Sequence, residues 1–365
     1  MYWLNRLEKR NDSGTKRQLQ VQPEQAIDFY SNDYLGLTKN KLFQNSLMEM
    51  VLNHPNAIMG STGARLVSGN SNVKNSVEEI IAKIHGYDSA LLFPSGYLAN
   101  LALYSCIAHR HDYVFVDEQV HRSILDGFKL AGVSVIKFKH NDLNHLNSLL
   151  QKYQGTIWVV LESLYSMGGD VAPLQDIVQL CQRYQAKLMV DEAHAFAVFG
   201  LGFVSSQNLQ EQVFACTITY GKAMGLHGAA VLGSKPLKEY LINFATPFVY
   251  STALPDYHFK SIEIGYRFLQ ENPQLANALF HNIQFYQENM SHKVHAAIGP
   301  IQPVLIPSTS KLLEIKKHLF QNKLLTYAML PPAVAADKQC LRICLHATHT
   351  EQEIKLLIDH LSEYL

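Results

Sequence analysis

The sequence lacks an excess of charge of either sign. Its 365 residues include 31 Lys and Arg against 31 Asp and Glu, so the formal net charge at pH 7 is zero. A balanced chain produces no long-range field that would attract nucleic acid or an anionic membrane surface. We therefore predict no nucleic-acid partner and no membrane partner, and we expect the protein to bind small molecules at a specific site.

Paired cysteines, zinc-ligand spacings and long apolar runs are also missing. The 17 histidines are scattered, and the segment 1–10 is amphipathic with an apolar run too short for a signal peptide. No long apolar span follows, so we expect a cytoplasmic protein without a metal site. The five cysteines form no CxxC motif and are predicted to be reduced core thiols: Cys106, Cys181, Cys216, Cys340 and Cys344.

What is present is the alternating pattern of an α/β protein. Hydrophobic residues make up 47% of the chain, and short apolar runs alternate with helical stretches. This order predicts a mainly parallel sheet covered by helices on both faces. The expected strands are 90–93, 113–116, 133–136, 157–161, 186–190 and 213–218.

Three parts are predicted along the chain. Helical patterns follow Pro255, then apolar runs that predict strands at 301–306 and 340–345, and a capping-box spacing at Thr350-Glu-Gln-Glu353 that opens the last helix. We expect an N-terminal segment over 1–40, a large domain over 41–255 and a smaller α+β domain over 256–365.

One lysine lies among glycines directly after a predicted strand. The octapeptide Thr219-Tyr-Gly-Lys-Ala-Met-Gly-Leu226 follows the run 213–218, and its glycines let the backbone pass close to a bound group. An amine near low-dielectric surroundings loses its proton and becomes a nucleophile toward carbonyls. Lys222 is therefore a candidate Schiff-base residue, while a surface lysine or a phosphate contact is the alternative.

An acidic residue ends another predicted strand. The run 186–190 delivers Asp191-Glu-Ala-His194 at its carboxyl end, where open α/β sheets place ligand-binding groups. An aspartate there can stay ionised opposite a protonated ring nitrogen, as a pyridoxal phosphate ring requires, and His194 can bind the same ligand. A helix N-cap Asp with a bystander His is the alternative interpretation.

Polar residues follow other predicted strands as well. Gly96 and Tyr97 lie between a strand and a helical run, where backbone amides bind phosphate. His121 follows the strand at 113–116, and Glu162 and Ser166 lie in the segment that ends the strand at 157–161. The sequence therefore predicts that polar groups from four strand ends converge.

Six segments, in order and spacing, resemble the α-oxoamine synthases, a pyridoxal-phosphate family of fold type I. The resemblance runs from about Asp28 to Leu361 and implies a large domain with a mainly parallel, seven-stranded type of sheet beside a smaller α+β domain. The segments are Ser31-Asn-Asp-Tyr-Leu-Gly-Leu37, Gly60-Ser-Thr-Gly-Ala-Arg-Leu-Val-Ser-Gly69, Ser95-Gly-Tyr97, Asp191-Glu-Ala-His194, Thr219-Tyr-Gly-Lys222 with Gly228-Ala-Ala230, and Tyr250-Ser-Thr-Ala-Leu-Pro255.

The resemblance implies a role for each catalytic residue. Lys222 would carry pyridoxal 5'-phosphate as a Schiff base and then take the α-proton of the bound amino acid. Asp191 would pair with the pyridine nitrogen, His121 would stack on the ring, and His194 would lie near the phenolic oxygen. Glu162 and Ser166 join them as predicted cofactor-binding residues.

The same resemblance implies how the cofactor phosphate and the substrate are held. Gly96, Tyr97 and Thr219 would bind the phosphate together with Thr252 from a second subunit, so the predicted protein is a homodimer with shared active sites. Arg342, alone among hydrophobic strand residues, would bind the substrate carboxylate, with Asn32 in the same substrate site. A structural salt bridge is the alternative for Arg342.

The implied reaction is a decarboxylative condensation of a small amino acid with an acyl thioester. Among the family's reactions, the best match joins L-alanine to a pimeloyl thioester of coenzyme A or of an acyl carrier protein, a step of biotin synthesis. Condensation of glycine with an acetyl thioester, or another reaction of the same family, is an alternative. A fold type I aminotransferase and a non-catalytic synthase subunit are alternatives of a different class. The sequence predicts an enzyme, because it retains Lys222 and Asp191.

Some positions depart from the family pattern. Gly168 stands where relatives usually carry aspartate, Ala197 replaces a usual glycine, and Lys74 replaces a common histidine. If the thioester carrier is a protein, a basic patch is expected near the mouth of the site. The residues considered for that patch are Arg65, Lys235 and Lys238.

Overall fold

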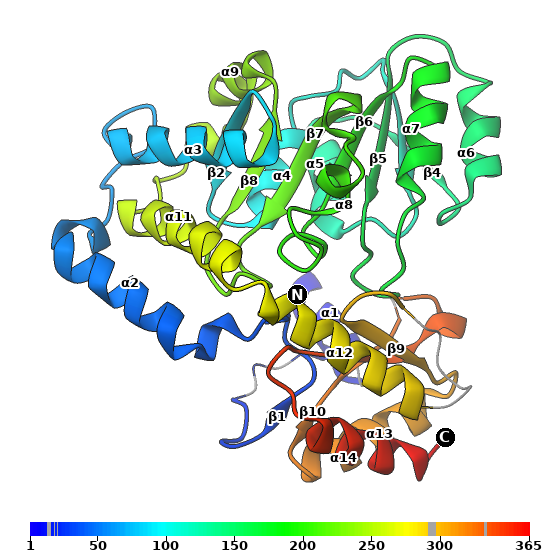
Figure 1. Cartoon of the computed structure of the whole chain (residues 1–365). Helices are drawn as coiled ribbons and strands as arrows, with labels where there is room; N and C mark the ends of the chain where they lie inside the picture. The colour runs from blue at the N-terminus through cyan, green and yellow to red at the C-terminus, as the bar shows by residue number, and fades with distance from the viewer. Residues whose placement is uncertain (13–15, 18, 20, 291–296, 332–333) are drawn as a thin grey trace.

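A seven-stranded sheet forms the centre of the larger part of the molecule (Figure 1). The computed structural model describes residues 1–365 except 13–15, 18, 20, 291–296 and 332–333. Only β8 runs antiparallel to its neighbours, so the predicted mainly parallel sheet is confirmed. In order across the sheet the strands are β2 (Ser89–Phe93), β8 (Ala229–Gly233), β7 (Val213–Thr219), β6 (Lys187–Asp191), β5 (Ile157–Glu162), β3 (Tyr113–Asp117) and β4 (Val135–Phe138).

Helices cover both faces of this sheet because its strands are apolar on both sides. In β5, Val159 and Leu161 belong to one core, and Trp158 and Val160 belong to the other, as the alternation of side chains along a strand requires. The second core is closed by α4 (Gly96–Tyr104), α5 (Arg122–Leu130), α9 (Lys235–Phe244) and α10 (Thr246–Val249). The first is closed by α2 (Lys41–Asn53), α3 (Asn72–His85), α6 (Leu143–Leu150), α7 (Leu174–Arg183) and α11 (Asp256–Glu271).

Local signals placed most of these elements correctly. The side chain of Ser71 caps α3 by accepting a hydrogen bond from the Lys74 amide, and Gly86 ends the helix at φ 71°. The strand expected at 133–136 lies two residues later. Its first residue, Val133, is needed to close the end of α5, where its amide donates to the Phe128 carbonyl.

The smaller part of the molecule contains a three-stranded antiparallel sheet and the last helices. Its strands are ordered β11 (Tyr327–Met329), β12 (Cys340–Cys344) and β9 (Ile301–Leu305), with α12 (Gln274–Asn289), α13 (Thr309–Gln321) and α14 (Glu351–Ser362) around them. The predicted capping box of α14 is present, formed by Thr350 and Glu353. This part is the smaller C-terminal domain expected from the sequence.

The N-terminal segment is tied to the C-terminal region. Strand β1 (Ile27–Asp28) pairs in parallel with β10 (Leu324–Leu325), although almost 300 residues separate them in the sequence. Helix α1 (Tyr2–Asp12) precedes it and buries no residue, and α8 (Phe203–Ser206) is a single turn in the large part. The domain boundaries at 40 and 255 remain predictions. Among the described residues, no helix has the length and apolar character needed to cross a membrane.

Candidate active site

The carboxyl ends of four strands present polar side chains at one edge of the large sheet. Strand β5 ends at Glu162, β6 at Asp191, β7 at Thr219 and β3 at Asp117. These strands are mutually parallel, and their register sets Glu162 beside Asp191. The edge is therefore the crevice where open α/β sheets bind ligands.

Lys222 reaches this edge from the tight loop that follows β7. At Gly225, with φ 63°, a side chain would come within 3.0 Å of the Thr38 amide, so only glycine lets the loop pack there. Burial lowers the pKa of the Lys222 amine to about 8, although the carboxylates of Asp191 and Glu162 oppose the shift. Within the described residues, the structure shows no hydrogen bond and no ion pair for this amine. The side chain is half-buried at the mouth of the crevice, so Lys222 is not a fully solvated surface lysine.

Asp191 is buried, with its side chain 3% exposed. Its Oδ2 accepts a 2.6 Å hydrogen bond from Asn100 Nδ2, and its Oδ1 accepts a 2.9 Å bond from the Ala193 amide. The helix N-cap interpretation is wrong, because the next helix, α8, begins only at Phe203 and has Gly202 as its N-cap. Asp191 is a carboxylate fixed in orientation at the floor of the crevice.

A chain of hydrogen bonds that the sequence did not reveal joins Asp191 to His121. Asn100 Nδ2 also donates to Ser123 Oγ at 3.0 Å, and Ser123 Oγ lies 2.8 Å from His121 Nδ1. Desolvation lowers the pKa of His121 from its usual value, although the Asp191 carboxylate opposes the shift. Because the Ser123 amide, which can only donate, also points at Nδ1 from 3.3 Å, the proton of neutral His121 is on Nε2.

A second chain of contacts joins His194 to Arg342. Tyr34 Oη lies 2.8 Å from His194 Nδ1 and 3.0 Å from Asn32 Oδ1, and it is buried. Arg342 Nη2 donates to Asn32 Oδ1 at 3.0 Å. Burial lowers the pKa of His194 well below its usual value, and the positive charges of Lys222 and Arg342 act in the same direction. Tyr34 is thus a further site residue, which lies within the quoted motif 31–37 but carried no separate signal.

Arg342 has no acidic partner among the described residues. It is 8% exposed and donates from Nε to the Ser166 carbonyl at 2.7 Å and from Nη1 to Cys344 Sγ at 2.9 Å. The salt-bridge interpretation is therefore not supported, because none of the ion pairs in the described chain includes this guanidinium. A buried guanidinium bound only by neutral groups is suited to an anionic ligand.

The beginning of α4 lies against the end of β7. Ser95 caps the helix, and a Cβ on Gly96 would lie 3.5 Å from Thr219 Cβ. The first amides of α4 therefore lie at the end of β7, a position that suits a phosphate group. The Thr219 hydroxyl donates to the Gly228 carbonyl at 3.1 Å, so its contact with a phosphate remains a prediction. Tyr97 is partly exposed and donates its hydroxyl hydrogen to Asp126 Oδ2 at 2.8 Å.

Thr252 lies apart from these residues in the hydrogen-bond pattern. It is exposed and forms an isolated antiparallel bridge with Ala64. No hydrogen bond to Lys222 or Asp191 is seen for it within the described chain. Its contribution to the site of a second subunit remains a prediction.

Unsatisfied polar atoms mark the space between these groups. Glu162 Oε1 and Asn100 Oδ1 are buried without a hydrogen-bond partner in the described chain. Burial raises the pKa of Glu162 well above its usual value, and the Asp191 carboxylate adds to the effect. An unpaired amine, a fixed carboxylate and a phosphate cradle at one edge are the donor set that pyridoxal phosphate requires.

The fold and this site together define a pyridoxal-phosphate enzyme of fold type I. Residues 24–361 match the model of the family described as aminotransferase class I and II. The chain belongs to this family, and pyridoxal phosphate is its cofactor. The resemblance to α-oxoamine synthases is confirmed by the relatives that the chain matches.

Three known proteins illustrate the similarity. The chain is 35% identical over 368 residues to an 8-amino-7-oxononanoate synthase of Cellvibrio japonicus, with 94% of this chain and 89% of the relative covered. The solved 8-amino-7-oxononanoate synthase of Francisella tularensis is 28% identical with a TM-score of 0.80, covering 93% of this chain and 98% of that one. The serine palmitoyltransferase of Sphingomonas wittichii, 24% identical with a TM-score of 0.89 over 99% and 96%, shows the shared fold.

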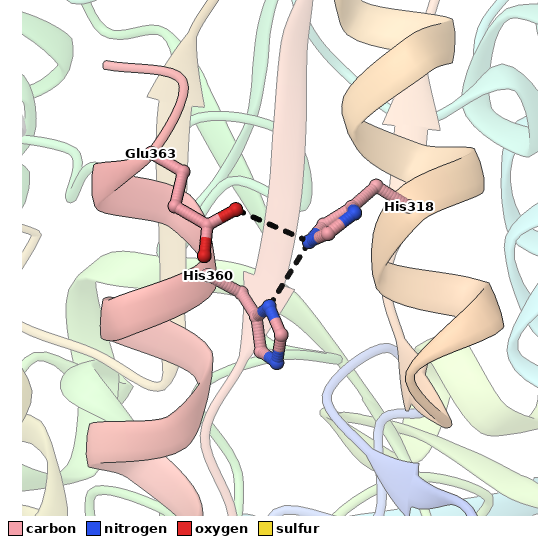
Figure 2. Close-up of side chains that lie close together, drawn as sticks. All are labelled: His318, His360 and Glu363. Carbon is pink, nitrogen blue, oxygen red and sulfur yellow. Dashed lines mark hydrogen bonds and ion pairs between the residues drawn. The ribbon is translucent and has the colours of Figure 1, made fainter.

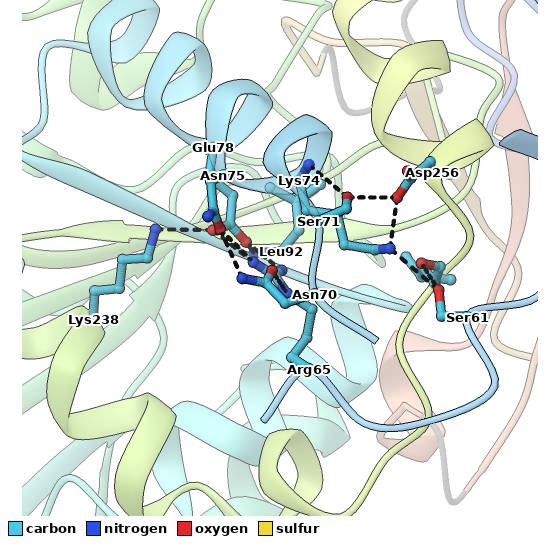
Figure 3. A network of polar contacts seen from close by, with 11 residues as sticks. Ser61, Arg65, Asn70, Ser71, Lys74, Asn75, Glu78, Leu92, Lys238 and Asp256 are labelled. Atoms are coloured by element: carbon cyan, nitrogen blue, oxygen red, sulfur yellow. Dashed lines mark hydrogen bonds and ion pairs between the residues drawn. The ribbon is translucent and has the colours of Figure 1, made fainter. Parts of the chain in front are cut away.

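Two of the residues considered for a basic patch are already paired. Figure 3 shows a network around Glu78, a fully buried carboxylate on α3. Glu78 binds Arg65 Nη1 at 2.8 Å and Lys238 Nζ at 2.8 Å, and it accepts the Leu92 amide at 3.0 Å. The single carboxylate of Glu78 offsets one of these two positive charges, so the carrier-protein patch remains a prediction.

The departures from the family pattern have local explanations. Lys74 is buried and donates to Asp256 Oδ1 at 2.6 Å and to Ser61 Oγ at 3.2 Å. Ala197 has φ 67°, a conformation that favours glycine. A Cβ on Gly168 would clash with the Asp170 carboxylate, so the Asp170 side chain would have to move if aspartate stood at position 168.

Proposed function

We propose that the protein catalyses the decarboxylative condensation of L-alanine with a pimeloyl thioester. The products are 8-amino-7-oxononanoate, carbon dioxide and the free thiol, and the reaction belongs to biotin synthesis. Relatives named 8-amino-7-oxononanoate synthase, at about one third identity over most of the chain, support this choice of reaction. The observation that carries it is Arg342, a buried guanidinium without an acidic partner in the described chain, beside Asn32.

Arg342 is proposed to bind the carboxylate of the amino acid. Its Nε and Nη2 are held by the Ser166 carbonyl and by Asn32, so the guanidinium has a fixed direction before substrate arrives. The positive charge of Arg342 contributes to the lowered pKa of Lys222, so the two groups act in one electrostatic environment. A carboxylate bound there would offset the cost of burying the guanidinium.

Lys222 is proposed to attach the cofactor and to accept the α-proton of the amino acid at Nζ. The lowered pKa of about 8 makes the unprotonated, nucleophilic amine more accessible near neutral pH than it is for an ordinary lysine. The cofactor, when bound, supplies the electron sink that stabilises the resulting carbanion. The chain contributes the base and its position.

Asp191 is proposed to hold the pyridine nitrogen in its protonated form. Asn100 Nδ2 and the Ala193 amide orient the carboxylate. Asn100 and Ser123 are proposed as positioning residues, because the same amide group also fixes Ser123 and thereby the tautomer of His121. A neutral ring at His121 can stack on the cofactor without adding charge above it.

A cavity beside Lys222 is proposed to receive the acyl thioester. Its volume is about 620 Å³, and its walls come from the N-terminal segment, from the loop after β7 and from the segment before α14. Asn32, Leu226 and Thr348 represent these three walls. The lining is largely polar and includes Asp28, Asp33 and Lys39, with Ile27 and Leu226 as its larger aliphatic side chains. Such a lining suits the polar arm that carries the acyl group.

We further propose a homodimer with shared sites. Exposed apolar side chains lie on both segments joined by the Ala64–Thr252 bridge: Val67 is 85% exposed and Tyr250 is 83% exposed. Such side chains are typical of a surface that a second copy covers. Sedimentation would show a dimer. Mixing inactive Lys222→Ala subunits with Thr252→Ala subunits would then restore activity, since each mixed dimer regains one intact site.

The reaction is tested by product detection. Purified, cofactor-loaded protein is mixed with alanine, glycine or serine against acetyl, succinyl, pimeloyl and palmitoyl thioesters, and the products are identified by mass spectrometry. Product from alanine with pimeloyl thioester is expected. Product only from glycine with acetyl or succinyl thioester would keep the mechanism and overturn the proposed substrates, and conversion of a keto acid without a thioester would indicate an aminotransferase.

A further inference from the structure

Three potential metal ligands converge where the C-terminal ends of α13 and α14 meet in the smaller domain. His318 lies in the last turn of α13, His360 lies in the last turn of α14, and Glu363 directly follows α14. Figure 2 shows the two imidazole rings and the carboxylate pointing toward one another across the gap between the helices. Helix spacing places His360 and Glu363 on one face, and packing of the helices adds His318.

The distances agree with one shared cation. His318 Nε2 is 3.0 Å from His360 Nδ1 and 3.7 Å from Glu363 Oε2, and one ligand atom from each residue lies within 4.8 Å of the others. Zinc binds imidazole nitrogen and carboxylate oxygen at about 2.0 to 2.2 Å, which sets tetrahedral ligand atoms about 3.3 Å apart. The two separations from His318 lie on either side of this value. The ligand atoms of His360 and Glu363 lie within 4.8 Å of each other, so a side-chain rotation would bring all three to tetrahedral spacing.

The local chemistry also favours a cation. In the described chain, the polar atoms of the three side chains form hydrogen bonds and ion pairs only with one another. Two imidazole nitrogens 3.0 Å apart must share a proton, and a metal ion can replace that proton. Each histidine lies in the last turn of its helix, where the helix dipole is negative and stabilises positive charge.

We propose that His318, His360 and Glu363 bind one divalent transition cation of the zinc type. Two imidazoles and one carboxylate are a set that zinc accepts, and water completes the fourth position. The cation links α13 to α14, which are otherwise joined by apolar packing such as that of Leu319 and Leu361 in one core. The site is a structural metal site that stabilises the C-terminal domain, and it takes no part in the condensation.

The experiment is a titration of untagged, cofactor-loaded protein with Co²⁺, followed by competition with Zn²⁺. Co²⁺ in a site of four or five ligands gives visible absorption bands, which Zn²⁺ abolishes when it replaces Co²⁺. We expect one equivalent of Co²⁺ to bind and to raise the melting temperature. In His360→Gln the bands are lost, and the affinity falls at least tenfold, because two ligands remain.

A matched control is His281→Gln. His281 also forms an exposed ion pair with α14, at 2.9 Å from Glu351, but only two ligand atoms meet there. This variant should bind Co²⁺ as the unchanged protein does. The cofactor's own absorption and the circular dichroism spectrum report that each variant is folded. Absence of Co²⁺ binding to the unchanged protein, or equal binding to His360→Gln, would overturn the proposal.

Discussion

Two buried polar networks in the large domain differ in how completely their charges are paired. Around Glu78, every charged group finds an opposite charge or a hydrogen-bond donor at 2.6 to 3.4 Å (Figure 3). At the strand ends, the Lys222 amine has no hydrogen bond in the described chain, and Glu162 Oε1 has no partner. The charges of the first network are paired within the protein. The second network leaves polar groups that a bound ligand would pair.

The charges of the first network stabilise the fold, whereas those at the strand ends are available for ligand binding and catalysis. A buried ion pair loses several kcal/mol when one partner is removed, because the other is left without compensation. A buried group that already lacks a partner contributes little to the free energy of unfolding. Its pKa is shifted by its surroundings and can match the value that catalysis requires. Substitutions in the two networks should therefore affect different quantities.

The largest expected effect is the loss of activity in Lys222→Ala. Turnover should fall on the order of 10⁴-fold or more, because both the attachment point of the cofactor and the base are removed. The visible absorption of the bound cofactor should change at the same time. Cofactor-free Lys222→Ala should be at least as stable as the cofactor-free parent, since the substitution removes a half-buried amine that has no partner in the described chain. Lys235→Ala is the control, and undiminished turnover in Lys222→Ala would refute the assigned role.

The next effect is on stability, in Glu78→Ala. Arg65, Lys238 and the Leu92 amide would each lose a partner, so the free energy of unfolding should fall by about 3 to 5 kcal/mol. Urea unfolding measures this change, and the folded fraction should keep its turnover number. Glu79→Ala, at the exposed neighbouring position, should change stability by less than about 0.5 kcal/mol. Equal stability of the two variants would contradict the pairing seen around Glu78.

A smaller effect is expected when the series of hydrogen bonds from Asp191 through Asn100 and Ser123 to His121 is broken. In Asn100→Ala both hydrogen bonds are lost, and kcat should fall about 10 to 100-fold, as when a group that orients another is removed. The titration of His121, followed by NMR, should shift as well. Ser123→Ala should shift the same titration with a weaker effect on kcat. An unchanged His121 titration in both variants would show that Asn100 is only a packing residue.

A pH effect is expected from His140, which lies between two carboxylates. Burial alone would lower its pKa, but hydrogen bonds to Asp117 and Asp170 outweigh burial and raise it to about 9. The contribution of His140 to the free energy of unfolding is complete below pH 6.5 and is lost as the pH rises through 9. The ring is partly solvated, so we expect about 1 to 2 kcal/mol. Urea unfolding of His140→Gln and the parent should differ by this amount at pH 6 and converge at high pH; a constant difference would contradict the assignment.

The smallest effect is a gain in stability from Ala197→Gly. Ala197 has φ 67°, a conformation that costs alanine about 1 to 2 kcal/mol, and glycine regains part of this despite its larger unfolded-state entropy. A gain of about 0.5 to 1 kcal/mol in the free energy of unfolding is expected. The same substitution at Ala82, inside α3, should destabilise by about 1 kcal/mol. A loss of stability at both positions would show that strain at Ala197 is negligible.

Local patterns in the sequence were sufficient for much of the fold. The strands, the caps of α3 at Ser71 and Gly86 and the capping box at Thr350 depend on neighbouring residues, and the structure places them as expected. The strand predicted at 133–136 begins two residues later, as β4. The reason is that the Val133 amide donates to the Phe128 carbonyl at the end of α5, the preceding helix. Lys222 and Asp191 were found because each follows a strand in a recognisable motif.

The sequence by itself determined the fold class, the strand ends and the residues that carry the family motifs, because these depend on periodicity and short spacings. Only the tertiary structure decided what each of these residues contacts. Asn100 meets Asp191 across 91 positions, Tyr34 meets His194 across 160, and His318 meets His360 across 42. No local pattern encodes such contacts, since they arise when the sheet order and the helix packing bring distant segments together. The pairing of Glu78 and the lack of an acidic partner for Arg342 in the described chain were decided in the same way.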